Sequence, residues 1–186
     1  LLTGGLGDLS LVIARELIER YQARVILVGR TKLPERSEWQ LYRRLHRGDD
    51  RIARAIKVLQ EFEAQGAEVF YAAADVCNAE QMATAIAQGK QRFGTIHGVL
   101  HTAGAVQDNL IQLKSRDEIE KVLAPKVYGT DVLHRLLKDE PLDLLVLFSS
   151  SSTDIAPAGQ VDYVAANAYL NAYAESAAAE GRRTVA

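Results

Sequence analysis

Short apolar runs alternate along the chain with segments whose apolar residues recur every three or four positions. The runs are rich in β-branched residues and predict strands buried on both faces of a parallel sheet, at 24–28, 68–71, 96–100 and 142–148. Leu1 and Leu2 precede a glycine turn and resemble the tail of a further strand, and residues 182–186 resemble the start of another. The alternation predicts an α/β fold with a doubly wound parallel sheet, which binds ligands at the carboxyl ends of its strands.

The spacing of apolar residues predicts helices between these runs. Two helical faces are expected to be buried: Leu9, Ile13, Leu17 and Tyr21 in the first helix, and Met82, Ile86 and Phe93 in a later one. Residues 118–137 and the alanine-rich residues 161–179 also predict helices. Pro125 is expected to mark a break or a first turn in the former.

The segment 31–66 is longer than one crossover needs, because a crossover between parallel strands normally holds a single helix. It predicts two helices, near 35–46 and 50–65, and the second has a shared face of Ile52, Ile56, Leu59 and Glu63. We interpret residues 1–186 as one catalytic domain with a helical insertion at about 31–66, placed on the surface.

Composition narrows the possible functions. The 186 residues are 48% hydrophobic and carry a net charge of −2, which is typical of a globular domain without a basic field for nucleic acid. The sequence contains no apolar run long enough to span a membrane, and we assign no metal site. The single cysteine, Cys77, cannot form an internal disulfide, which fits a cytoplasmic location. Both ends break off within predicted strands, so we expect a piece of a longer polypeptide.

A glycine-rich turn follows the first strand and opens the first helix. It comprises Thr3, Gly4, Gly5, Leu6 and Gly7. Glycines at this position let backbone N–H groups approach a pyrophosphate. Glycine turns are common, and two residues depart from the pattern. Ser10 replaces the third glycine, and Asp8 adds a negative charge.

The end of the second predicted strand indicates which dinucleotide is bound. An acidic residue there would bind the ribose 2′-hydroxyl of NAD, but this strand ends in Gly29 and Arg30. A guanidinium binds a 2′-phosphate in a two-pronged contact, so we expect NADPH; the alternative is an ordinary solvated arginine. After the third strand, Asp75 and Val76 are expected beside the adenine. After the fourth, Ala103 and Gly104 are expected beside the nicotinamide.

Three residues near the last predicted strand and helix suggest carbonyl reduction. Ser150 ends an apolar strand, Tyr163 begins a helix thirteen residues later, and Asn167 lies one turn further on the same face. Reducing a ketone requires a hydride, a proton donor and a group that polarises the carbonyl. A phenol, with a free pKa of about 10, donates readily only beside a positive charge, and Lys126 is the candidate. Singly, each residue has an ordinary structural explanation.

The motifs resemble the ketoreductase domain of a modular polyketide synthase, within the short-chain dehydrogenase/reductase superfamily. The matching segments are 3–7, 28–30, 74–76, 101–104, 124–130, 147–150 and 159–168. Ordinary short-chain reductases place the lysine four residues after the tyrosine. Here Asn167 occupies that position and the lysine lies upstream at Lys126. That exchange is the mark of synthase ketoreductases.

The resemblance implies a role for each residue. Tyr163 would protonate the carbonyl oxygen, Ser150 would donate a hydrogen bond to it, Lys126 would lower the phenol pKa and orient the cofactor, and Asn167 would support a proton relay. The substrate implied is a β-ketoacyl chain held as a thioester on an acyl carrier protein, and the other implied partners are further domains of the same synthase.

The resemblance also implies a stereochemical outcome. Asp108 matches the last residue of the Leu-Asp-Asp marker of members that form a D-configured β-hydroxyl, whereas Val106 and Gln107 depart from it. Members of opposite sense carry a tryptophan where this chain has Ile155. We expect Asp108 and Gln160 to act in substrate contact and stereocontrol, with a D product. The alternative is that Asp108 only caps the following helix.

Two other functions stay open from the sequence. One is a stand-alone short-chain reductase of a small ketone, and the other is a structural synthase domain that no longer reduces. Cofactor binding separates the second from a working reductase.

Overall fold

The computed structural model describes residues 1–46 and 50–186. Its six strands form one parallel sheet in the order β3-β2-β1-β4-β5-β6. The strands are β1 (Leu2–Thr3), β2 (Val25–Gly29), β3 (Val69–Ala73), β4 (Gly98–His101), β5 (Leu144–Leu147) and β6 (Thr184–Val185). The order reverses direction at β1, which creates the crevice that doubly wound folds use for ligands. The predicted fold class is confirmed.

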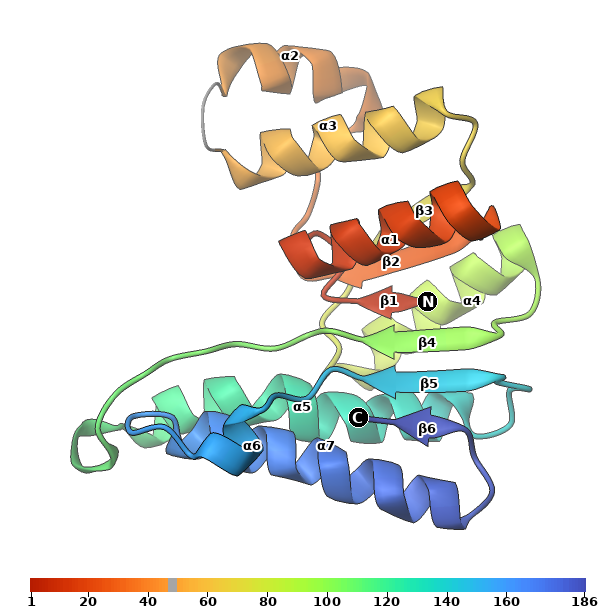
Figure 1. Cartoon of the computed structure of the whole chain (residues 1–186). Coiled ribbons are helices and arrows are strands. Elements are labelled where there is room, and N and C mark those ends of the chain that lie inside the picture. The colour runs from red at the N-terminus through yellow and green to blue at the C-terminus, as the bar shows by residue number, and fades with distance from the viewer. Residues whose placement is uncertain (47–49) are drawn as a thin grey trace.

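Helices cover both faces of the sheet (Figure 1). They are α1 (Asp8–Tyr21), α2 (Trp39–Leu45), α3 (Arg51–Ala64), α4 (Ala79–Phe93), α5 (Arg116–Leu137), α6 (Ser152–Ile155) and α7 (Val161–Ala179), with short 3₁₀ turns η1 (Arg36–Glu38) and η2 (Ile111–Leu113). One core cluster joins the sheet to α1 and α3, and another joins it to α4 and α5. The strand arrows all point to the edge where the long loop after β4 and the segment after β5 lie.

Only the first part of the predicted insertion 31–66 is an outer layer, because α3 belongs to the core cluster next to the sheet. Helix α2 lies beyond α3, away from the sheet (Figure 1). Trp39 is buried against the cluster that contains Ile56, Leu59 and Phe62. Asp50 caps α3 by accepting a 2.7 Å hydrogen bond from the Ala53 N–H. The shared face predicted for this helix is correct at its centre, whereas Ile52 and Glu63 at its ends are only partly buried.

Two predictions about helices are wrong. In α1, Leu9 and Tyr21 are exposed, and the buried face is instead Ser10, Ala14 and Ile18. The buried stripe lies one residue further along, because small side chains let the helix approach the glycine turn closely. Pro125 does not interrupt its helix either, since α5 continues from Arg116 to Leu137. A proline inside a helix removes one backbone hydrogen bond, and the packed face of α5 outweighs that loss.

Candidate active site

Two glycines make the turn after β1 possible. Gly4 has φ of 72°, a conformation that favours glycine. A Cβ on Gly4 would lie 2.7 Å from the Thr102 hydroxyl, and one on Gly5 would lie 2.7 Å from the Val28 nitrogen. The Gly5 N–H donates to the Val28 carbonyl over 2.8 Å. The turn is therefore pressed against β2 and β4, with its backbone close to the crevice.

Ser10 fits the place where the motif has a third glycine. It is 1% exposed, and its hydroxyl lies 3.0 Å from the Gly4 carbonyl oxygen and 2.6 Å from the Thr102 hydroxyl. The side chain thus joins the turn to β4 instead of separating helix from strand. Asp8 is exposed in the first turn of α1, where a carboxylate is favourable.

A hollow of about 460 Å³ lies at the carboxyl ends of β1, β2, β3 and β4. Nine of the predicted cofactor residues line it: Gly4, Leu6, Gly7, Gly29, Arg30, Asp75, Val76, Ala103 and Gly104. Thr3 and Gly5 are buried and are absent from this lining. A turn whose glycines leave no room for a Cβ, beside an exposed guanidinium, fits the phosphates of a dinucleotide.

A second guanidinium was missed by the sequence prediction. Arg51, the first residue of α3, lines the same hollow as Arg30. The insertion was interpreted only as a surface addition, and no motif marks the position. Tyr71 supports the backbone on either side of Arg30, because its hydroxyl lies 2.6 Å from the Thr31 carbonyl oxygen and 3.0 Å from that of Gly29. Burial raises the pKa of Tyr71 to about 12, so it remains a donor.

His101 connects the glycine turn to the segment that carries Lys126. The ring is fully buried, with Nε2 2.9 Å from the Pro125 carbonyl oxygen and Nδ1 2.7 Å from the Thr3 hydroxyl. Burial, aided by the nearby Lys126 charge, lowers the pKa of His101 to about 4. The neutral ring therefore donates from Nε2 to the carbonyl and accepts from Thr3 at Nδ1.

Lys126 and Tyr163 come together although 37 positions separate them. The Lys126 Nζ lies 5.8 Å from the centroid of the Tyr163 ring and donates a 2.6 Å hydrogen bond to the Phe148 carbonyl. Burial lowers the pKa of Lys126 to about 8. A Cβ on Gly104 would lie 3.2 Å from the Lys126 Cε, so the glycine leaves room for this side chain.

A smaller hollow of about 230 Å³ lies over these two residues. Lys126, Tyr163 and Ser149 line it, and Leu9, Thr102 and Gly104 line both this hollow and the larger one. The two hollows therefore adjoin, so that a dinucleotide with its phosphates at the glycine turn would reach toward Tyr163.

Asn167 and Ser150 lie in different relations to Tyr163. The Asn167 amide donates a 2.7 Å hydrogen bond to the Tyr163 carbonyl one turn back, and its Oδ1 is buried without a protein partner. The Ser150 hydroxyl accepts from the Ser152 N–H over 3.1 Å, and Ser150 lines a separate hollow beside the end of β5. Ser149, which the sequence prediction did not select, lines the hollow with Tyr163.

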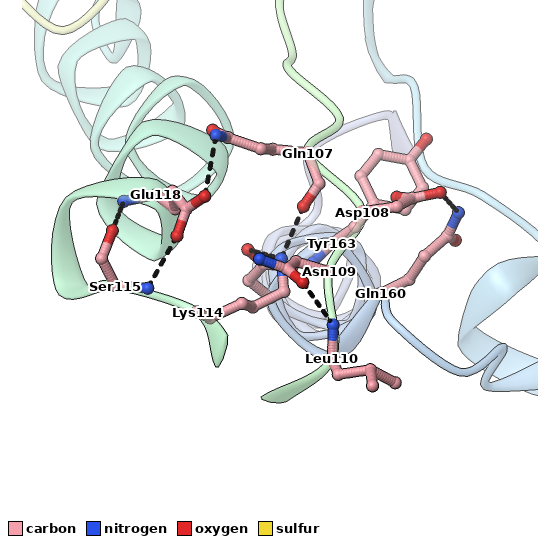
Figure 2. Close-up of polar contacts among 10 residues, drawn as sticks. Gln107, Asp108, Asn109, Leu110, Lys114, Ser115, Glu118, Gln160 and Tyr163 are labelled. Carbon is pink, nitrogen blue, oxygen red and sulfur yellow. Dashed lines mark hydrogen bonds and ion pairs between the residues drawn. The ribbon is translucent and has the colours of Figure 1, made fainter. Parts of the chain in front are cut away.

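The two predicted stereocontrol residues contact each other. Gln160 donates from Nε2 to Oδ2 of Asp108 over 2.9 Å (Figure 2). The N-cap of α5 is Ser115, in a reciprocal capping box with Glu118, so Asp108 does not cap that helix. Ile155 is exposed in α6.

Neither a metal site nor a membrane-spanning helix occurs in the described part of the chain. In residues 1–46 and 50–186 no group of three or more His, Cys, Asp or Glu is arranged to hold a metal ion. No helix in that part of the chain is both long and apolar enough to cross a membrane.

The strand order, the glycine turn and the position of the tyrosine helix define a Rossmann-like fold of the short-chain dehydrogenase/reductase type. A family model described as KR domain matches residues 1–186. The chain therefore belongs to the KR domain family, as its motifs indicated, and to a class of domains that binds nicotinamide cofactors.

Similar curated proteins are polyketide synthases. The chain is 38% identical over 189 residues to 6-methylsalicylic acid synthase of Aspergillus terreus, a match that covers all of this chain and 10% of that protein. It is 36% identical over 176 residues to polyketide synthase PksL of Bacillus subtilis, covering 94% of this chain and 4% of that protein. The chain thus spans a tenth or less of these relatives.

Solved structures agree. A ketoreductase domain from the bacillaene assembly line is 35% identical with a TM-score of 0.81, over 98% of this chain and 40% of that chain. An N-terminal ketoreductase from the macrolactin assembly line is 34% identical with a TM-score of 0.80, over 98% of this chain and 34% of that one. The described chain spans about a third to two fifths of these ketoreductases.

Proposed function

We propose that this domain uses NADPH to reduce a β-ketoacyl thioester, carried on an acyl carrier protein, to a β-hydroxyacyl thioester during polyketide assembly. The observation that carries the proposal is the meeting of the Lys126 ammonium and the Tyr163 ring in a hollow that adjoins the glycine-turn hollow. The resemblance to assembly-line ketoreductases supports the substrate class, and the acyl carrier protein and other synthase domains are the partners we propose.

Arg30 and Arg51 support the choice of NADPH over NADH. Both are exposed guanidiniums that line the glycine-turn hollow. A 2′-phosphate carries about two negative charges, and guanidinium groups bind phosphate oxygens in paired hydrogen bonds. The lining offers Asp75 at the end of β3 but no carboxylate at the end of β2, where a ribose 2′-hydroxyl would be held.

The proton in this reaction comes from Tyr163. A bound nicotinamide cofactor supplies the hydride to the carbonyl carbon. The Tyr163 phenol gives its proton to the carbonyl oxygen as negative charge develops there, and the Lys126 ammonium stabilises the phenolate that remains. We assign the second hydrogen bond to that oxygen to Ser150, as the family resemblance implies, although Ser149 is the serine that lines the hollow with Tyr163. Asn167, with its buried Oδ1 lacking a protein partner, holds a water that returns a proton to Tyr163.

We further propose that the product is the D-configured alcohol. The support is Asp108, which matches the D-type marker and bonds Gln160, the residue before the Tyr163 helix, while Val106 of the same loop lines the hollow with Tyr163. Ile155 occupies the position of the opposite marker and is exposed in α6. Chiral analysis of the reduced thioester measures this directly, and a mostly L product would overturn the assignment.

The proposed activity is tested with the full-length protein, NADPH and a β-ketoacyl thioester. Tyr163→Phe removes only the phenol oxygen, so NADPH binding followed by fluorescence should stay within about twofold, while turnover falls by about 100-fold or more. A wild-type protein that binds no NADPH would favour a structural domain instead. Unchanged turnover in the variant would remove Tyr163 from its role.

A further inference from the structure

A buried ion pair joins the loop after β4 to the first turn of α7. Lys114 lies at the end of that loop, and its Nζ is 2.8 Å from Oδ2 of Asp162. The two side chains are 0% and 1% exposed. Among the ion pairs of the described residues this one is the most deeply buried. The proposed proton transfer uses neither group, so the pair needs a separate explanation.

Each member of the pair also holds a backbone group. The Lys114 ammonium donates a 2.5 Å hydrogen bond to the carbonyl of Gln107, the residue before Asp108 (Figure 2). Asp162 accepts the N–H of Tyr163 at Oδ1 over 2.9 Å. That N–H belongs to the first helical turn, where no intrahelical acceptor exists. The pair therefore links the backbone beside Asp108 to the backbone of Tyr163.

Weaker contacts run beside this link. The Asn109 N–H donates to the Gly159 carbonyl over 3.0 Å, and Gln160 donates to Asp108, which is exposed. Gln107 also donates from its amide to Oε1 of Glu118, over 3.2 Å, at the start of α5 (Figure 2). The Gln160–Asp108 bond is exposed and exchanges readily with water, so it defines the position of the loop poorly without the buried pair.

Stability alone does not explain why such a pair would be kept. Burying two charges is costly, and well-packed apolar side chains of similar volume are often as stable or more so. A charged pair differs from apolar packing in its directionality, because the ammonium and carboxylate each accept only a few positions for their partners. The buried Lys114–Asp162 pair therefore differs from apolar packing in that it fixes the position of the loop along the helix.

We propose that Lys114 and Asp162 are positioning residues that hold loop 105–113 in one register on the Tyr163 helix. Because that loop supplies Ala105 and Val106 to the wall of the hollow that holds Lys126 and Tyr163, the register fixes which face of the keto group meets the reacting atoms. The inference rests on the reductase function proposed above. It adds a specificity device that lies beneath the loop and makes no contact with the substrate.

The test compares two double variants of the full-length protein. Lys114→Met with Asp162→Leu replaces the pair by apolar side chains. Lys90→Met with Glu140→Leu removes a partly exposed lysine–carboxylate pair near the C-terminal ends of α4 and α5. NADPH binding, melting temperature and the ratio of the two β-hydroxy products are measured for each. The single variant Lys114→Arg keeps the positive charge, so its product ratio should stay close to that of the wild type.

The first variant should bind NADPH within about threefold of wild type while its product ratio falls tenfold or more toward an even mixture. The control should keep the wild-type ratio. An unchanged product ratio in a folded Lys114→Met/Asp162→Leu variant would overturn the proposal. So would an equal loss in the control, because the effect would then be a general response to lost stability.

Hydrogen exchange on the wild-type protein tests the register without any variant. The Asn109 amide, which donates to the Gly159 carbonyl, should exchange together with the Tyr163 amide, which donates to Asp162, because the buried pair must open before either is released. Exchange of the loop at the rate of an open surface segment would overturn the proposal even if the variants fail to fold. Absence of NADPH binding in the wild type would refute the reductase function instead, and the exchange result would still decide the register.

Discussion

The two halves of the sheet place their charged groups differently. On the side of β2 and β3, Arg30 and Arg51 are exposed at the edge of the glycine-turn hollow. On the side of β4 and β5, Lys114, Lys126 and Asp162 are buried or nearly so, and each is fixed by hydrogen bonds. The first half is suited to attracting a mobile anionic ligand, and the second is suited to holding chemistry in a fixed geometry.

This contrast predicts its largest effect at Lys126. Lys126→Met keeps the length of the side chain but removes the charge beside Tyr163, so turnover should fall by about 1,000-fold, a larger loss than that in NADPH binding. In the wild type, turnover should also decline as the pH rises through about 8, because the ammonium then loses its proton. Steady-state kinetics from pH 6 to 10 measures both effects. A flat profile with a fully active variant would contradict a role for the buried charge.

The neighbouring serines give a sharper test within the same half. Ser150→Ala should lower kcat/KM by about 100-fold, because it removes a donor to the developing oxyanion. Ser149→Ala is the matched control and should cost less than about tenfold. The comparison is informative because Ser149, and not Ser150, lines the hollow with Tyr163. The reverse order of effects would assign the carbonyl contact to Ser149.

Substitutions in the half with the exposed arginines should change dinucleotide affinity and leave the turnover number nearly unchanged. Arg30→Ala should weaken NADPH about 10- to 100-fold and NADH less than about twofold, because only the former carries the 2′-phosphate. Arg51→Ala should act in the same direction with a smaller effect. Lys32→Ala, an exposed cation outside the lining, is the control. Equal losses for both dinucleotides would remove the phosphate contact from Arg30.

The same division explains what the sequence could predict. Apolar runs and the glycine turn are local patterns, so the strands, the sheet type and the residues around Gly4 followed directly. The pairing of Lys126 with Tyr163 was predicted from the need of a phenol for a nearby ammonium and then from the family resemblance, because spacing alone does not bring α5 and α7 together. Arg51 and the Lys114–Asp162 pair were missed, since each depends on how a loop or insertion folds back onto the site.

His101 lies between the two halves of the sheet, where its ring contacts Thr3 and Pro125. At neutral pH we expect its titration to have the smallest effect of those considered. Its folded pKa of about 4 lies below the value of about 6.5 for an unfolded chain, so the unfolded state binds more protons between these values. Stability should therefore be complete above about pH 6.5 and fall by on the order of 3 kcal/mol as the pH drops toward 4. His101→Asn lacks the titrating group, and its urea midpoints at pH 7 and 4.5 should differ less than those of wild type. Parallel losses in both proteins would show that the buried ring, although it joins Thr3 to Pro125, does not govern acid stability.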